Sequence, residues 1–262
     1  MRDAYGKHWL LLRGLSRESA HWGDFPELLR QAFPQSKIST LDLPGSGNRN
    51  SESCPMTIAD ITDAVRRQAI RQNLMQQPLT VLALSMGGMI AWEWMLKHPE
   101  DICAGALINV SLASLSPFYK RMHWRNYPEL FKLLTLQDPL QRELTIVRRV
   151  TNLNEKHHAL AERWEQIHRA RPISRLNSLR QLAAAACYRP DARKPQSPIL
   201  LLNSRGDRLV DPDCSAAIQR RWQLQLETHL WGGHDLTSDD GPWVVNTLQA
   251  WLRKLQTEAA AS

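Results

Sequence analysis

The fold of this chain is decided by one stretch, LTVLALSMGG at residues 79–88. Its first six residues are apolar or β-branched and follow a proline, which predicts a fully buried strand. The strand breaks at Ser85, and from residue 89 to about residue 98 the composition is that of a helix. A serine in such a sharp strand-to-helix turn presents its hydroxyl at the carboxyl end of the strand. Ser85 is therefore the first candidate for a nucleophile.

Small residues flank this serine at the spacing that a tight turn requires. Gly87 lies two residues after it and Ala83 two residues before it, a variant of the G-x-S-x-G pattern. The N–H of Met86 and the N-terminus of the helix would stabilise negative charge beside the hydroxyl. The alternative is a glycine-rich junction with an incidental serine. An acid and a histidine later in the chain would decide between the two interpretations.

Length and composition indicate one large α/β domain. The chain has 262 residues, of which 43% are hydrophobic. No stretch approaches the roughly 18 apolar residues of a membrane span. The N-terminus leads directly into a strand, without the apolar region of a signal peptide. Four cysteines are widely separated, which predicts free thiols and a cytoplasmic location. They are Cys54, Cys103, Cys187 and Cys214.

Strand and helix patterns alternate along most of the sequence. Strands are expected over 8–12, 37–43, 79–84, 104–110, 198–203 and 224–230, and helices over 22–33, 57–75, 89–98, 213–222 and 243–256. This alternation predicts an α/β fold with a mostly parallel sheet and helices on both faces.

The alternation stops between residues 116 and 194. This segment has helical periodicity and no convincing strand, and it is inserted where the carboxyl ends of the strands meet. Open α/β sheets bind their ligands at that edge. We therefore expect a core formed by residues 1–115 and 195–262, with residues 116–194 as an inserted helical lid.

An acid and a histidine follow at two further strand ends. Asp207 comes just after the strand at 198–203, and His234 lies in a Gly-Gly-His turn after the next strand. The order Ser85, Asp207, His234 predicts a catalytic triad, in which the histidine takes the serine proton and the aspartate orients the imidazole.

Three other aspartates near these positions are weaker candidates for the acid. Asp211 and Asp213 flank a proline and have the pattern of turn and helix-capping residues. Asp235 adjoins His234, and a neighbour in sequence reaches the imidazole Nδ1 with poor geometry. Asp207 remains the expected acid.

Five motifs together give the chain its family resemblance. They are LLLRGLS at 10–16, LDLPGSG at 41–47, ALSMGG at 83–88, RGD at 205–207 and GGHD at 232–235. With them the sequence resembles α/β-hydrolase-fold serine hydrolases, in the group of carboxylesterases, proline iminopeptidases and pimeloyl-ACP methyl ester carboxylesterase.

The resemblance implies two further features of the site. It makes the N–H of Leu15 the second oxyanion-hole donor beside that of Met86, and it places an aromatic residue, Trp22, near the substrate. The group usually has His-Gly where this chain has Arg13 and Gly14.

Positive charge is concentrated in the predicted lid. Residues 116–194 contain 16 Lys+Arg and 7 Asp+Glu, a net charge of +9, whereas the whole chain carries +7. The charge is either a solvated helical surface or an electrostatic funnel for an anionic substrate or an acidic acyl carrier. Arg142, Arg148 and Arg149 are the expected contacts in the second case.

The residue patterns do not call for a cofactor. No histidine or cysteine cluster has metal-ligand spacing, no glycine-rich phosphate loop is present, and no nucleic-acid-binding motif accompanies the basic segment. We therefore expect an enzyme with no metal and no cofactor, which binds a small-molecule substrate and not nucleic acid.

The sequence thus predicts a serine hydrolase that cleaves a carboxylic ester or thioester through an acyl-enzyme. One alternative is an iminopeptidase-like peptidase, which needs a lid carboxylate to hold a free amino terminus, and Glu162 or Glu165 would serve. A second is a hydrolase-like protein that only binds a small apolar ligand.

Overall fold

A six-stranded parallel sheet forms the centre of the computed structural model, which describes residues 4–260. The strands are β1 (His8–Leu12), β2 (Lys37–Leu41), β3 (Leu79–Leu84), β4 (Ile102–Ile108), β5 (Ile199–Ser204) and β6 (Gln225–His229). Their order across the sheet is β2-β1-β3-β4-β5-β6, and each neighbouring pair is parallel. This confirms the predicted α/β fold.

Helices cover both faces of the sheet and its carboxyl edge. Around the sheet lie η2 (Ser19–Trp22), α1 (Phe25–Ala32), η3 (Gly47–Arg49), α2 (Ile58–Arg71), α3 (Met86–Lys97), α9 (Asp213–Trp222) and α10 (Leu236–Ala260). Between β4 and β5 lie α4 (Phe118–Arg121), η4 (Trp124–Asn126), α5 (Tyr127–Thr135), α6 (Pro139–Val150), η5 (Asn154–Lys156), α7 (His157–Ala170) and α8 (Arg175–Cys187).

Alternate side chains of each buried strand enter two separate cores. On β1, Leu10 and Leu12 pack into the core that includes α2 and α3, whereas Trp9 and Leu11 pack into the core that includes α1 and α10. This alternation follows from the two-residue period of a strand. A strand buried on both faces is mainly apolar, which is why β1 (HWLLL) and β3 (LTVLAL) are nearly continuous apolar runs.

Several helix boundaries differ from the predicted ones; α2, for example, ends at Arg71 rather than at residue 75. The backbone explains the starts of two helices. The helix expected from residue 22 begins at Phe25, because Gly23 has φ 57° and separates α1 from η2. The last helix begins at Leu236 rather than at residue 243. Asp240 interrupts it with φ −146°, two residues before Pro242, whose ring and missing N–H disfavour a continuous helix.

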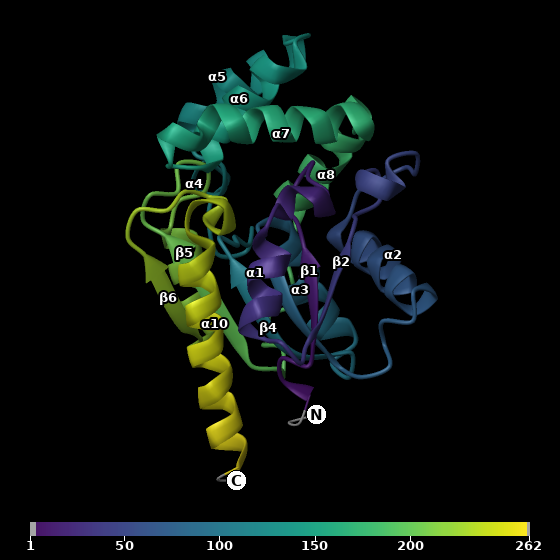
Figure 1. Cartoon of the computed structure of the whole chain (residues 1–262), viewed down its shortest axis with the longest axis vertical. Helices are drawn as coiled ribbons and strands as arrows, with labels where there is room; N and C mark the ends of the chain where they lie inside the picture. The colour runs from purple at the N-terminus through teal and green to yellow at the C-terminus, as the bar shows by residue number, and fades with distance from the viewer. Residues whose placement is uncertain (1–3, 261–262) are drawn as a thin grey trace.

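The described residues of the segment 116–194 form helices and no strand. We call this segment the helical insertion. In Figure 1 its helices α5, α6 and α7 lie across one end of the sheet, opposite the end at which both chain termini lie. Helices α6 and α7 share a small core of their own, to which Val147 and Trp164 contribute. Its boundaries as a domain and its role as a lid remain predictions.

Candidate active site

The turn between β3 and α3 holds Ser85 in a strained backbone conformation. Its φ is 57° and its ψ is −118°, and residues other than glycine rarely have positive φ. The Ser85 N–H donates to the carbonyl of Ile108 at 2.8 Å, and the Ser85 carbonyl accepts the N–H of Gly88 at 2.9 Å. A strained serine at the carboxyl end of a central strand is typical of a nucleophile elbow.

Two glycines allow the backbone to approach closely around this turn. A Cβ on Gly87 would lie 2.5 Å from the carbonyl oxygen of Leu12 and 2.7 Å from that of Arg13. A Cβ on Gly14 would lie 3.2 Å from the Cβ of Ser85. The end of β1 is therefore packed directly against the serine turn, which explains why the sequence has the smallest residue at both positions.

The two predicted oxyanion donors belong to residues that line one cavity together with Ser85. Met86 is the first residue of α3, and the first N–H groups of a helix have no partner within it. Leu15 follows Gly14 in the loop after β1 and also lines the cavity. The structure thus brings Leu15, Met86 and Ser85 to the lining of one cavity.

Asp207 and His234 form a buried hydrogen-bonded pair. Asp207 Oδ2 lies 2.7 Å from His234 Nδ1, and the two side chains are 1% and 5% exposed. The other oxygen, Oδ1, accepts the N–H groups of Leu209 at 2.8 Å and Val210 at 2.9 Å, which fixes the carboxylate. Since Nδ1 faces the aspartate, Nε2 is the ring nitrogen left for proton transfer. His234 lines the same cavity as Ser85.

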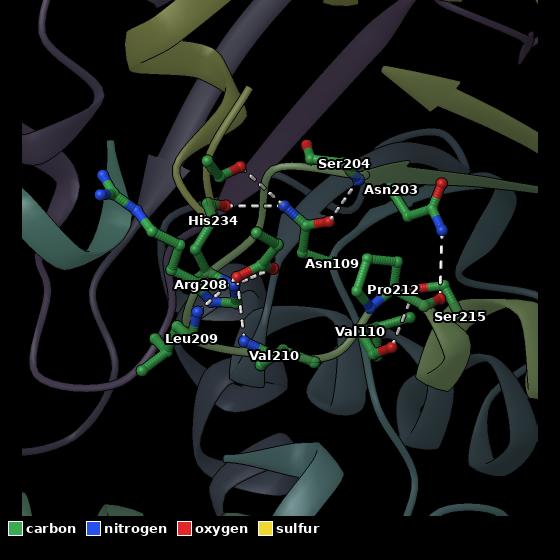
Figure 2. Close-up of polar contacts among 12 residues, drawn as sticks. Asn109, Val110, Asn203, Ser204, Arg208, Leu209, Val210, Pro212, Ser215 and His234 are labelled. Atoms are coloured by element: carbon green, nitrogen blue, oxygen red, sulfur yellow. Dashed lines mark hydrogen bonds and ion pairs between the residues drawn. The ribbon is translucent and has the colours of Figure 1, made fainter. Parts of the chain in front are cut away.

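Asn109, at the end of β4, joins the strand before the acid to the histidine turn. Its Nδ2 donates to the carbonyl of His234 at 2.8 Å, and its Oδ1 accepts the N–H of Ser204 at 3.1 Å (Figure 2). Asn109 is not among the site residues that the sequence predicted. The available signal was an asparagine at a strand end, where it tolerates the positive φ of 49° found here.

The three rival aspartates all have other partners. Asp211 Oδ1 accepts the N–H of Asp213 at 2.9 Å, and the Asp213 carboxylate pairs with Lys120 at 2.6 Å. Asp235 pairs with Arg13. Asp207 is the aspartate that contacts His234 through Nδ1.

The Arg13–Asp235 pair links the loop after β1 to the histidine turn. Arg13 Nη2 lies 2.5 Å from Asp235 Oδ2, and the side chains are only 3% and 2% exposed. The Thr237 hydroxyl donates to the same carboxylate at 2.9 Å. Burial raises the pKa of Asp235, but the charge and hydrogen bonds of Arg13 and the Thr237 hydroxyl hold this pKa below its ordinary value. This pair replaces the histidine expected from the resemblance.

Trp22, the predicted aromatic contact of the substrate, is held away from the cavity by its packing. Trp22 is buried and is not among the described residues that line the cavity. The Arg13 guanidinium lies over its ring, 4.8 Å from the centroid, and Phe25 packs on the ring at 5.7 Å. The Trp22 ring therefore packs against the Arg13 guanidinium and does not face the cavity.

The cavity has a volume of about 560 Å³ and lies between the carboxyl ends of the strands and the helical insertion. Its wall is mainly apolar, with contributions from the elbow helix, the insertion and the loop after β5. Examples are Met89, Leu182, Leu209 and Val210. Such a wall suits an apolar organic group placed beside Ser85.

The three predicted arginine contacts have different surroundings. Arg142 lines the cavity, and its Nε is buried without a hydrogen-bond partner. Arg149 also lines the cavity, but its guanidinium is paired with Glu129. Arg148 is exposed and is not part of the described cavity wall. Of the three, only Arg142 presents an unpaired charge to the cavity, because no ion pair of Arg142 occurs among the described residues.

A second arginine of the cavity wall lies close enough to affect Arg142. Burial lowers the pKa of Arg142; Glu143 raises it, and the nearby charges of Arg17 and Arg175 lower it again. Arg17 is neutralised by Glu143 at 2.9 Å, whereas Arg175 has no ion pair in the described chain. Arg142 and Arg175 therefore make this side of the cavity positive.

The carboxylates suggested for an amino-terminal substrate do not reach the cavity. Glu162 pairs with His158 at 3.2 Å, and Glu165 pairs with Arg169. Neither is among the described residues of the cavity wall.

Other reactive groups lie away from this cavity. Burial raises the pKa of the Cys54 and Cys214 thiols to about 11, which disfavours the thiolate form. Ligand atoms of His98, Glu100 and Asp101 lie within 4.8 Å of one another. Asp101, however, accepts hydrogen bonds from Arg66 and from the indole of Trp94, so its oxygens serve the packing of α2 and α3. In the described part of the chain, no helix is both long and apolar enough to span a membrane.

Known proteins resemble this chain in sequence and in fold. A protein of Cronobacter sakazakii assigned as the carbamate hydrolase RutD is 24% identical over 232 residues, which are 86% of this chain and 82% of that protein. A thermophilic esterase of Thermogutta terrifontis superposes with a TM-score of 0.73 at 20% identity, covering 96% of this chain and 91% of the esterase. The RedJ thioesterase of Streptomyces coelicolor superposes with a TM-score of 0.64 at 18% identity, covering 97% and 87%.

One family model matches most of the sequence. It is described as serine aminopeptidase, S33, and it matches residues 27–240, a range that includes the Ser85 turn and the Asp207–His234 pair. The chain therefore belongs to the serine aminopeptidase S33 family and is an α/β-fold serine hydrolase.

Proposed function

We propose that the protein hydrolyses carboxylic esters or thioesters through an acyl-enzyme formed on Ser85. One observation carries the proposal: His234, whose Nδ1 lies 2.7 Å from Asp207 Oδ2, lines the same cavity as the strained Ser85 turn. This combination provides a nucleophile, a base and a group that orients the base.

The proposed reaction has two steps. Ser85 Oγ attacks the carbonyl carbon while His234 Nε2 takes its proton, and the N–H groups of Leu15 and Met86 stabilise the oxyanion. His234 then returns the proton to the leaving alcohol or thiol. Water activated by His234 hydrolyses the acyl-enzyme, while Asp207 keeps the imidazole in the required tautomer.

The cavity favours an acyl or alcohol group that is apolar with an anionic end. The apolar wall would bind hydrocarbon. Arg142 and Arg175 would bind an anionic group, because a partly buried guanidinium without a carboxylate gains most from an anionic ligand. An acyl group linked to an acidic carrier is a further proposal, for which the exposed Arg148 offers a contact outside the cavity.

Ester hydrolysis is better supported than aminopeptidase activity. A free amino terminus would need an unpaired carboxylate. The acidic residues in the described cavity wall are Glu129 and Asp235, and each is paired with an arginine.

The proposal is tested by a turnover screen with p-nitrophenyl esters of graded chain length, acyl thioesters and aminoacyl anilides. We expect turnover of esters or thioesters, inactivation of the wild type by a fluorophosphonate, and loss of several orders of magnitude in rate for Ser85→Ala. Turnover of the anilides alone would favour the peptidase, and no turnover or labelling would favour a protein that only binds a ligand.

We also propose that the protein is cytoplasmic. The four cysteines are free in the structure, and thiols persist in reducing compartments.

A further inference from the structure

Asp207 and His234 lie on two separate loops that follow neighbouring strands. The acid loop, residues 205–209, follows β5, and the histidine loop, residues 231–235, follows β6. The register of β5 and β6 ends at Ser204 and His229, and the last bond between them is donated by the Arg205 N–H to the carbonyl of His229 at 2.9 Å, before either catalytic side chain. The bond between the two side chains therefore depends on contacts outside the sheet.

One side chain of the helical insertion joins the two loops. Asn152 lies just after α6, in residues 150–153, which we call the clamp segment. Its Nδ2 donates to the carbonyl of Gly206 at 2.9 Å and to the carbonyl of Trp231 at 2.6 Å. A side-chain amide has two N–H donors, so one amide group binds the acid loop and the histidine loop at once.

The backbone of the clamp segment binds the same two loops. The carbonyl of Val150 accepts the N–H of Asp235 at 2.7 Å. The carbonyl of Thr151 accepts a hydrogen bond from Nη2 of Arg208, also at 2.7 Å. Each loop is thus held by a side-chain bond and by a bond to the clamp backbone.

The clamp segment also packs closely against Gly206 and Gly233, and the buried Asp239 carboxylate binds both the segment and the histidine loop. A Cβ on Gly206 would lie 2.6 Å from Nδ2 of Asn152, and a Cβ on Gly233 would lie 2.6 Å from the carbonyl oxygen of Val150. The carboxylate of Asp239 accepts the N–H of Asn152 at 2.9 Å and the N–H of Gly233 at 2.6 Å. The clamp segment therefore lies directly against both loops.

We propose that Asn152 is a positioning residue for the hydrolytic reaction, because its amide sets the placement of Asp207 relative to His234. The proposal rests on the proposed function, in which these two side chains orient and perform proton transfer. Asn152 itself is not among the described residues that line the cavity, so its effect would be transmitted through the pair.

Loss of this amide should lower kcat and leave KM nearly unchanged. A displacement of about 1 Å in catalytic geometry costs on the order of 100-fold in rate. We therefore expect Asn152→Ala to lower kcat for a short neutral p-nitrophenyl ester by about 10- to 100-fold, while the unchanged cavity wall preserves KM.

A double-mutant comparison separates positioning from general support of the fold. Asn152→Ala is measured in the wild type and in the Asp207→Asn background. Residues that act as one unit have non-additive effects, so the asparagine should matter little once the carboxylate is gone, with a further loss below about threefold. An equal fold-loss in both backgrounds would overturn the proposal.

Two further variants keep the comparison interpretable. Asn154→Ala changes an exposed asparagine two residues away and should have wild-type kcat. Asn152→Asp keeps the side-chain shape, but an ionised aspartate has no donor, so kcat should fall as it does in Asn152→Ala. If circular dichroism shows that Asn152→Ala is unfolded, Asn152→Asp takes its place in the comparison.

The possible failures are distinct. Wild-type kcat in a folded Asn152 variant would overturn the positioning role alone, with Ser85 still labelled by a fluorophosphonate. Wild-type kcat in Asp207→Asn would overturn the assignment of the acid, and the positioning role with it.

Discussion

Arg13 is the residue at which this chain departs most clearly from the group it resembles. A histidine is usual at this position; here an arginine is buried on Trp22 and paired with Asp235, the residue after the proposed catalytic base. A buried ion pair is not by itself stabilising, but removal of one partner leaves an uncompensated charge in the interior. Loss of either Arg13 or Asp235 should therefore destabilise the fold and disturb the histidine turn.

We predict that Asp235→Asn lowers the free energy of unfolding by about 3–5 kcal/mol, because Arg13 would stay buried without a counter-charge. Denaturant unfolding measures the difference. The matched control is Asp191→Asn, which removes an exposed aspartate paired with Arg193 and should change stability little. Equal stability of Asp235→Asn and the wild type would mean that the pair contributes nothing.

The same pair predicts how stability depends on pH. The folded-state pKa of Asp235 is lowered, so the carboxylate contributes stability above its unfolded-state pKa of roughly 3.9 and loses this contribution as pH falls toward the folded-state value. The wild-type Tm should therefore fall more steeply than that of Asp235→Asn as pH is lowered below about 5. If Tm fell equally with pH in the wild type and in Asp235→Asn, the loss of stability in acid would be due to other carboxylates.

At the scale of elements, the junction of β1 and α3 decides where the nucleophile lies. A Cβ added to Gly87 would lie only 2.5 Å and 2.7 Å from the backbone carbonyl oxygens of Leu12 and Arg13, closer than a Cβ can approach them. Gly88, the next residue of α3, is pressed against the Val110 side chain, where a Cβ would lie 3.1 Å from Cγ2. The Val110 side chain beside Gly88 can shift to make room for a methyl group, whereas the backbone beside Gly87 cannot. Alanine should therefore be tolerated better at residue 88 than at residue 87.

We predict that Gly87→Ala destabilises the protein by at least 1–3 kcal/mol, roughly the cost of overpacking a core, and abolishes turnover because it displaces the serine turn. Gly88→Ala should cost less and retain activity. Thermal unfolding and ester turnover of the two variants provide the comparison. A Gly87→Ala enzyme as stable and active as the wild type would contradict the close packing of β1 against α3.

The elements that the sequence predicted well are those whose evidence is local. Buried strands such as β3 and capped helices such as α2, where the Thr57 side chain accepts the N–H of Asp60, are determined by residues near one another in the chain. The contact between Asp207 and His234 agrees with their places after two neighbouring strands, and their role with Ser85 in catalysis stays a prediction. The Arg13–Asp235 pair and the bonds of Asn152 join residues far apart in sequence, and no local pattern predicts which distant groups meet.

Over the whole molecule, the excess positive charge lies in the helical insertion, but only some of its arginines lack an acidic partner. Much of the charge is compensated, as in the pairs of Arg149 with Glu129 and of Arg169 with Glu165. Among the described residues, Arg121, Arg142 and Arg175 line the cavity without an ion pair. Arg121 donates to the backbone carbonyls of Ala185 and Ala186, whereas Nε of Arg142 is buried without a hydrogen-bond partner. A general funnel of arginines is therefore less well supported than recognition of an anionic group inside the cavity.

We predict that Arg142→Gln raises KM about tenfold or more for an ester with a terminal carboxylate, since hydrogen bonds to charged groups contribute about 1.5–3 kcal/mol. KM for the uncharged ester of equal length should stay constant. Arg148→Gln, on the exposed side of the same helix, is the matched control and should leave both unchanged. Equal effects of Arg142→Gln on the two esters would exclude Arg142 as an anion-binding residue.

The central claim, that Ser85 is the nucleophile of the Asp207–His234 pair, is tested most directly by locating a covalent adduct. The protein is treated with a fluorophosphonate, digested and mapped by tandem mass spectrometry, with Ser178→Ala as a control for another serine of the cavity wall. We predict one adduct on Ser85 in the wild type and in Ser178→Ala, no adduct in Ser85→Ala, and much slower labelling in His234→Ala. An adduct on a different residue, or undiminished labelling of Ser85→Ala, would contradict the proposed mechanism.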